Sequence, residues 1–227
     1  MSTFDHINNT PDENRDAILE CVLGHVAFDG WGDKVLQSGA NELAVDVEYI
    51  KLAFPKGSQD VINYWFRSHD AKMLDILEQY DAGSMKIREK IIAAIKARMQ
   101  LNADHKEAVR RTLTWLALPQ NVAFATKSLW TTSDVMWHWA GDRATDYNHY
   151  TKRAILSGVY SSTLLIWLDD DSEGHAETWA FLDRRIDNVM QFEKVKAKMH
   201  KAAEKFDLHH LAERMGAWKR GKEPETK

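Results

Sequence analysis

Apolar residues recur every three or four positions through most of this 227-residue chain, and no stretch alternates convincingly with the two-residue period of a β-strand. The spacing places apolar side chains on one face of a helix, where they can be buried together. The chain has only 4 prolines and 11 glycines, and the clearest breaks fall at residues 28–32, 54–58 and 169–174. The sequence therefore predicts an all-α fold.

Turn residues and capping side chains divide this pattern into separate helices. Asp33, Asp46, Asn121 and Ser133 each precede an apolar run and are predicted to cap the helix that follows. The predicted helices cover residues 14–27, 33–41, 47–53, 59–80, 86–101, 104–118, 122–130, 134–140, 146–168 and 176–205.

The order of these helices predicts a head, a body and a terminal helix. We expect a disordered N-terminus (1–13), a helix-turn-helix-like head (14–56), a helical body (57–205), an amphipathic helix (206–220) and a disordered tail (221–227). Three short helices with tight joints before a long one are typical of such a head. The segment from Ile18 to Phe66 resembles the N-terminal part of the tetracycline-repressor-like fold. By analogy with that fold, we expect a homodimer.

The charge of the head argues against DNA as a partner. Between Asp12 and Lys56 the chain carries nine acidic and four basic residues, a net charge of −5. Release of counterions from the phosphates supplies much of the affinity for DNA, so an acidic face opposes binding. We expect a structural head and no nucleic-acid partner. A ligand-responsive transcription regulator of the tetracycline-repressor type is the alternative, because the head keeps that topology.

The most distinctive stretch is that from Asp134 to Leu182, together with the residues that directly follow it. It contains DVMWHWAGDRATDYNHYTKRAILSGVYSSTLLIWLDD and then TWAFLDRRIDNVMQFEK. In this order the motifs resemble those of the coenzyme Q (ubiquinone) biosynthesis accessory family, a lipid-binding branch of the same fold. The resemblance implies a non-catalytic protein whose body holds an isoprenoid quinone intermediate. It also implies a membrane contact through the last helix and a di-iron quinone hydroxylase as partner.

The same resemblance implies a patch that faces the hydroxylase. Its residues in this chain are Asp134, Met136, Trp137, Asp146, His149, Tyr150 and Arg153. Eukaryotic relatives carry a tryptophan before the tyrosine, where this chain has His149, so the aromatic contact with the partner is predicted to be weaker. An ordinary core role for Met136 and Trp137 is the alternative.

The helix predicted from Asp146 carries the expected lipid contacts. Ala154, Gly158 and Ser162 follow one another at four-residue spacing and form a small face flanked by larger apolar residues. Such a face can leave room for a slender chain, although an ordinary buried helix has the same spacing. The predicted lipid-binding residues are Ile155, Gly158, Val159, Ser162, Ile166 and Trp167.

The C-terminal segment has the pattern of a helix that lies on a membrane. Leu208, Leu211, Met215 and Trp218 fall on one helical face, and basic residues flank it on both sides. From Lys194 to Lys227 there are ten basic and five acidic residues. Packing of this helix on its own domain or on a second subunit is the alternative, and the resemblance favours the membrane.

No catalytic machinery is recognisable in the sequence. There is no nucleotide-binding glycine pattern, no Gly-x-Ser-x-Gly and no Glu-x-x-His pair for a di-iron site. Asp146/His149 and Asp207/His210 each have the three-residue spacing that places both side chains on one helical face. The first pair is better explained as the start of a helix, and the second as part of the interfacial helix, than as a metal site. We therefore expect no catalytic residue, no metal and no cofactor. A metal-dependent enzyme is the third hypothesis for the function.

The expected location is the cytoplasm, on the inner (cytoplasmic) face of the membrane. One cysteine, Cys21, excludes an internal disulfide and suits a reducing compartment. Residues 1–14 are polar and acidic and lack the features of a targeting peptide.

Overall fold

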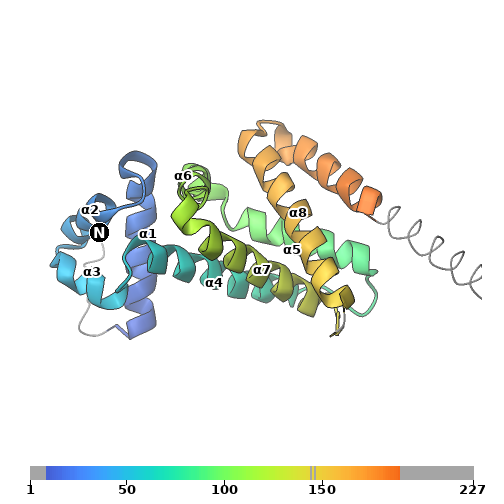
Figure 1. The fold of residues 1–227 in the computed structure, drawn as a ribbon, viewed down its shortest axis with the longest axis horizontal. Coiled ribbons are helices and arrows are strands. Elements are labelled where there is room, and N and C mark those ends of the chain that lie inside the picture. The colour runs from blue at the N-terminus through green and yellow to red at the C-terminus, as the bar shows by residue number, and fades with distance from the viewer. Residues whose placement is uncertain (1–8, 144, 146, 190–227) are drawn as a thin grey trace, which may run out of the picture. The chain divides into compact units, whose positions relative to one another are not determined.

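The computed structural model describes residues 9–143, 145 and 147–189, and every regular element in them is helical, as predicted (Figure 1). The elements are α1 (Pro11–Asp29), α2 (Asp33–Leu43), α3 (Val47–Ala53), α4 (Ser58–Leu77), α5 (Ile87–Gln100), η1 (Ala103–His105), α6 (Lys106–Leu116), η2 (Pro119–Asn121), α7 (Val122–Trp139), α8 (Tyr147–Asp169) and η3 (Glu173–His175). Residues 176–189 are helical as well. None of the described helices has both the length and the apolar character needed to cross a bilayer.

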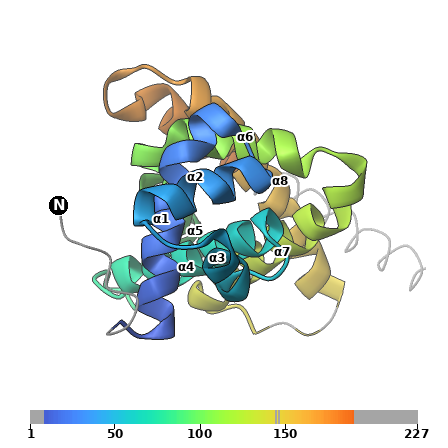
Figure 2. The same cartoon turned by 90° about the vertical axis from the view of Figure 1, so that its left-hand side faces the viewer.

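The first three helices pack together as the head. α1 contacts α2 and α3; the three lie together toward the left in Figure 1 and face the viewer in Figure 2. Their apolar faces supply fully buried side chains, among them Ile18, Val22, Leu36 and Ile50. α1 also packs on α6, which joins the head to the body, and the chain up to Trp179 forms one compact unit.

The body is built around the long helices. α4 packs on α5 and α7, and α7 packs on α8. α4 buries Val61, Ile62, Trp65, Met73 and Leu77 at helical spacing, within the helix predicted over 59–80. A second compact unit begins at Ala180, within the stretch predicted as a single body, and of this unit the structure describes residues 180–189.

The first helix begins at Pro11, earlier than the predicted Asn14. Thr10 and Glu13 form a capping box: the Glu13 backbone N–H donates to Thr10 Oγ1 at 3.3 Å, and the Thr10 backbone N–H donates to Glu13 Oε2 at 2.7 Å. This arrangement satisfies backbone donors that the start of a helix leaves without partners. Residues 11–13, predicted as disordered, are therefore helical.

The predicted helix caps are only partly correct. Asp46 caps α3 by accepting from the Glu48 backbone N–H at 3.0 Å. Asp33 is instead the first residue of α2, after Gly32. Asn121 precedes α7 as expected, but its side chain donates to the Trp115 carbonyl at 2.8 Å rather than capping the helix.

α7 is one helix, whereas the sequence analysis predicted two helices with Ser133 as a cap between them. Ser133 is fully buried, and its Oγ lies 2.9 Å from Oγ of Ser157 in α8. Its hydroxyl thus bridges two packed helices. The helix continues without a break from Val122 to Trp139. The prediction was wrong because a serine within a helix can find a partner outside it.

Candidate functional site

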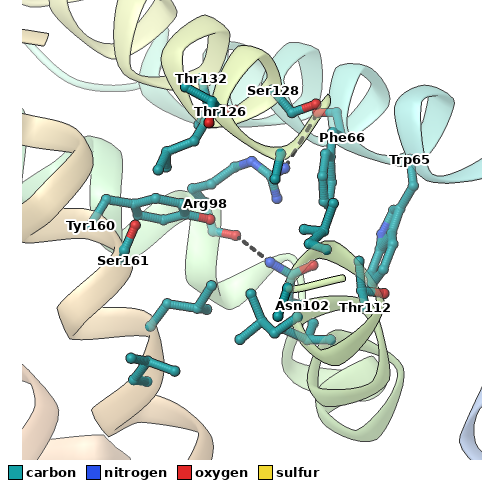
Figure 3. Close-up of a pocket in the computed structure, with 18 residues that line it drawn as sticks. Trp65, Phe66, Arg98, Asn102, Thr112, Thr126, Ser128, Thr132, Tyr160 and Ser161 are labelled. Carbon is teal, nitrogen blue, oxygen red and sulfur yellow. Dashed lines mark hydrogen bonds between the residues drawn. The ribbon is translucent and has the colours of Figure 1, made fainter. Parts of the chain in front are cut away.

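A cavity of about 450 Å³ lies within the body, lined by α4, α5, α6, α7 and α8 (Figure 3). α6 contributes Val109, Leu113 and Leu116, whose spacing of four and three residues places them on one helical face. Leu129 of α7 and Leu164 of α8 extend the apolar wall. The volume falls in the usual range for sites that enclose small organic molecules.

One wall of the cavity is polar and rests on a buried ion pair. Arg98 of α5 lines the cavity and is 3% exposed. Its Nε donates to Oδ1 of Asp70 in α4 at 2.9 Å. Thr132 of α7 donates to both oxygens of the same carboxylate, at 3.1 and 3.0 Å. The pair therefore joins α4, α5 and α7 behind the cavity.

His69 lies beside this pair and is uncharged. Nε1 of Trp65 lies 3.1 Å from its Nε2, and Nη1 of Arg98 lies 3.2 Å from its Nδ1. Burial, reinforced by the positive charge of Arg98, lowers the pKa of His69 to about 3. At neutral pH the imidazole adds no charge, so the polar wall holds one cation and one anion that neutralise each other.

Two more polar groups complete this wall. Asn102, which follows α5, is buried and donates through Nδ2 to the carbonyl of Arg98 at 3.1 Å. Tyr160 reaches from α8 into the cavity on the same side, as Figure 3 shows. Burial raises the pKa of Tyr160, so its hydroxyl stays protonated. The sequence analysis missed this wall, because Asp70, Arg98 and Tyr160 are far apart in the chain.

The six α8 residues predicted to bind lipid do not line this cavity. Val159 and Trp167 are buried, Gly158 and Ile166 are exposed, and Ile155 and Ser162 are half-buried. α8 instead lines the cavity with Tyr160, Ser161, Leu164 and Leu165. α8 does reach the cavity, but through a different face from the one that carries the six predicted residues.

The small-residue face of α8 is open on its outer side. A methyl group added at Gly158 would have no atom of another residue within 4 Å, apart from its own helix backbone and chain neighbours. Trp167, at the far end of the helix, is core: it is 1% exposed, and Nζ of Lys106 lies 4.7 Å from its ring centroid. The four-residue step from Tyr160 to Leu164 was the better sequence signal for the cavity.

The residues of the predicted partner patch are divided between core and surface. Met136 and Arg153 are buried, at 0% and 1% exposure, so neither can be presented to a partner as the patch requires. Arg153 donates to Asp134 at 2.5 Å and to Asp142 at 3.1 Å. Nε1 of Trp137 donates to the carbonyl of Lys152 at 3.0 Å. These contacts fasten the end of α7 to the start of α8.

Two residues of the patch, His149 and Tyr150, form an aromatic cluster with Trp130. Tyr150 is 61% exposed, and its ring centroid lies 5.1 Å from that of His149 and 5.9 Å from that of Trp130 in α7. Asp146 lies outside the described residues, as do the predicted membrane residues Leu208, Leu211, Met215 and Trp218 and the Asp207/His210 pair.

Cys21, His25 and Glu42 form a group that the sequence analysis did not foresee. Their ligand atoms lie within 4.8 Å of one another between α1 and α2, and Nε2 of His25 lies 2.6 Å from Oε2 of Glu42. Burial, with the Glu42 carboxylate nearby, raises the pKa of Cys21 to about 12. The Cys21 thiol is therefore protonated, and it donates to the Gly39 carbonyl at 3.5 Å. The contact between His25 and Glu42 holds the other two side chains of the group together.

Two of the three aspartates at 169–171, Asp169 and Asp170, have structural partners. Asp170 is buried and accepts from the backbone N–H groups of Ser172 and Thr178, at 2.9 and 2.8 Å. Hydrogen bonds from these two residues hold the pKa of Asp170 well below its usual range. Asp169 pairs with Arg110 at 2.8 Å. This loop therefore fixes the turn after α8.

The fold is that of the tetracycline-repressor-like proteins. The crystal structure of a TetR transcriptional regulator from Nitrosomonas europaea matches with a TM-score of 0.64 and covers 78% of this chain and 97% of that one. Its sequence identity of 24% makes this a likeness of fold alone.

Residues 122–193 match the model of the COQ9 family. The family resemblance drawn from the sequence motifs is thereby confirmed. The ubiquinone biosynthesis protein COQ9 of Rattus norvegicus is 31% identical over 180 residues, which are 76% of this chain and 57% of that protein. COQ9-B of Xenopus laevis is also 31% identical, over 76% of this chain and 61% of that protein.

The human COQ9 protein is 29% identical over 76% of this chain and 56% of its own length. This chain thus spans less than two thirds of the length of these relatives. All three are named as mitochondrial proteins, whereas the sequence analysis expected a cytoplasmic location.

Proposed function

We propose that this chain is a lipid-binding accessory protein of ubiquinone biosynthesis. In this proposal it holds an isoprenoid quinone intermediate and presents it to a membrane-associated di-iron hydroxylase, while making or breaking no bond itself. The names of the COQ9 relatives support the pathway. The mitochondrial names also fit a mitochondrial location better than a cytoplasmic one.

The cavity is the observation that carries the proposal. Removing apolar surface from water is favourable by about 25 cal/mol per Å², and the leucine and valine side chains of α6 offer such a surface to a prenyl chain. An apolar cavity of about 150 Å³ is large enough to bind benzene. The cavity here, at about 450 Å³, has room for a ring and a short length of chain.

Leu113→Trp is expected to weaken binding of a short-chain prenylated benzoquinone by at least about tenfold, because the larger ring occupies volume that the ligand needs. Isothermal titration calorimetry measures the affinity. Leu118→Trp is the matched control, since Leu118 is 41% exposed and does not line the cavity. Equal affinity of both variants and the unchanged protein would remove the cavity from the proposal.

The partner and the membrane complete the proposed function. The aromatic cluster of Trp130, His149 and Tyr150 offers an accessible surface for the hydroxylase. We propose that the apolar residues near the C-terminus, such as Leu211 and Trp218, dock on the membrane and that the chain acts as a homodimer. Pull-down with the hydroxylase, flotation with vesicles and sedimentation test these three parts separately.

A ligand-responsive transcription regulator remains the second candidate, because the structural neighbour is a TetR regulator and α1–α3 keep the order of such a head. The net charge of −5 between Asp12 and Lys56 weighs against it. Sequence-specific DNA binding at physiological salt in a gel-shift assay would favour the regulator.

A further inference from the structure

The hydroxyl of Tyr160 is an unused polar group in the wall of the cavity. Tyr160 is 8% exposed, and its hydroxyl makes no hydrogen bond to any residue in the part of the chain that the structure describes. Figure 3 shows the ring directed from α8 toward the side of the cavity where Arg98 and Asn102 lie. The hydroxyl lines the cavity and can act both as a donor and as an acceptor, so it can form a hydrogen bond with a ligand oxygen that reaches this wall.

Arg98 also has hydrogen-bonding capacity left over. A guanidinium carries five N–H donors. Within the described residues, Nε donates to Asp70, Nη1 contacts His69 and Nη2 donates to the carbonyl of Phe66 at 3.4 Å. These contacts occupy at most three of the five donors. At least two N–H groups therefore have no acceptor among the described residues, and Arg98 lines the cavity.

The charge balance of this wall indicates which acceptor fits. Asp70 neutralises Arg98 at 2.9 Å, and His69 is uncharged. A buried carboxylate or phosphate would find no net positive charge here, and burying an unpaired anion is costly. A neutral oxygen, such as a quinone carbonyl or a phenol hydroxyl, needs only hydrogen bonds.

We propose that Arg98, Asn102 and Tyr160 form a subsite that hydrogen-bonds a neutral ring oxygen of the bound ligand. The oxygenated ring lies at this wall, and the prenyl chain lies along Leu113 and Leu164. The subsite rests on the proposed function, because it assumes that the cavity binds a prenylated ring. It selects quinone- or phenol-type lipids over fatty acids and phospholipids.

Tyr160→Phe tests the subsite, because it removes one oxygen and keeps the ring. Calorimetry is done with three probes: a benzoquinone with a short prenyl chain, a benzene ring with the same chain, and a fatty acid of similar length. The variant should bind the quinone about 3- to 10-fold more weakly and the oxygen-free ring with unchanged affinity. The unchanged protein should bind the fatty acid more weakly than the quinone. Tyr80→Phe, the same change at a site 46% exposed and outside the cavity, should alter neither affinity.

The outcomes separate this subsite from the proposed function. If the unchanged protein binds the quinone but Tyr160→Phe weakens both ring probes equally or neither, the subsite is wrong and the lipid-binding role stands. A fatty acid bound as tightly as the quinone also overturns the subsite. If the unchanged protein binds neither ring probe, the lipid-binding role and the subsite both fall.

Discussion

Asp70→Asn is expected to lower the free energy of unfolding by about 3–5 kcal/mol, because it leaves Arg98 as a buried cation without its anion. Both side chains are enclosed, at 9% exposure for Asp70 and 3% for Arg98, and the two atoms of the pair are 2.9 Å apart. Asp70 also accepts two contacts from Thr132, so its loss loosens the junction of α4, α5 and α7. Urea unfolding followed by circular dichroism measures the change.

Glu48→Gln is the matched control for this prediction. Glu48 pairs with Lys51 at 2.8 Å, but both side chains are largely exposed, and such pairs contribute less than about 1 kcal/mol. If Asp70→Asn were no more destabilising than Glu48→Gln, water would have to reach the Arg98–Asp70 pair, and the closed polar wall described for the cavity would be incorrect.

Trp167→Ala is expected to destabilise the protein by about 3–5 kcal/mol while leaving the affinity for a prenylated quinone nearly unchanged. Trp167 is 1% exposed and packs beside Lys106 and His175. The centroids of the Trp167 and His175 rings are 5.8 Å apart. It does not line the cavity. Its removal therefore costs packing rather than ligand contact.

The neighbouring Ile166→Ala provides the comparison, because Ile166 is on the same helix and 40% exposed. Its loss should cost less than about 1 kcal/mol, since most exposed substitutions have small effects. A Trp167→Ala variant that unfolds like the parent protein but loses quinone affinity would restore Trp167 to the lipid site, as the sequence first predicted. Thermal unfolding and calorimetry on the same samples distinguish the two cases.

The sequence predicted the helices well because their signals are local. The helix predicted over 59–80 and the Asp46 cap depend on residues within one or two turns of one another, and both were found in the structure, the helix as α4. Ser133 is an example of a residue whose role a local pattern does not predict. Its role depends on Ser157 in another helix, which a pattern within α7 cannot reveal.

The candidate site was less predictable for the same reason. The small face of α8 suggested where a chain could lie, but which face meets the cavity depends on how α8 packs on α7 and on where α5 and α6 place the other walls. The polar wall joins Asp70, Arg98 and Tyr160, each from a different helix. In the predicted partner patch, an arginine such as Arg153 is expected to be exposed because it is charged. It is buried instead, because Asp134 and Asp142 neutralise its charge.

Lipid extraction and mass spectrometry of the purified full-length chain test the central claim most directly. The cavity is proposed to carry an isoprenoid, so the protein should retain a prenylated quinone or a related isoprenoid through purification. Leu113→Trp, which reduces the cavity, should carry much less of it than Leu118→Trp does. A chain that purifies without lipid, or one whose lipid is unaffected by Leu113→Trp, would contradict the account.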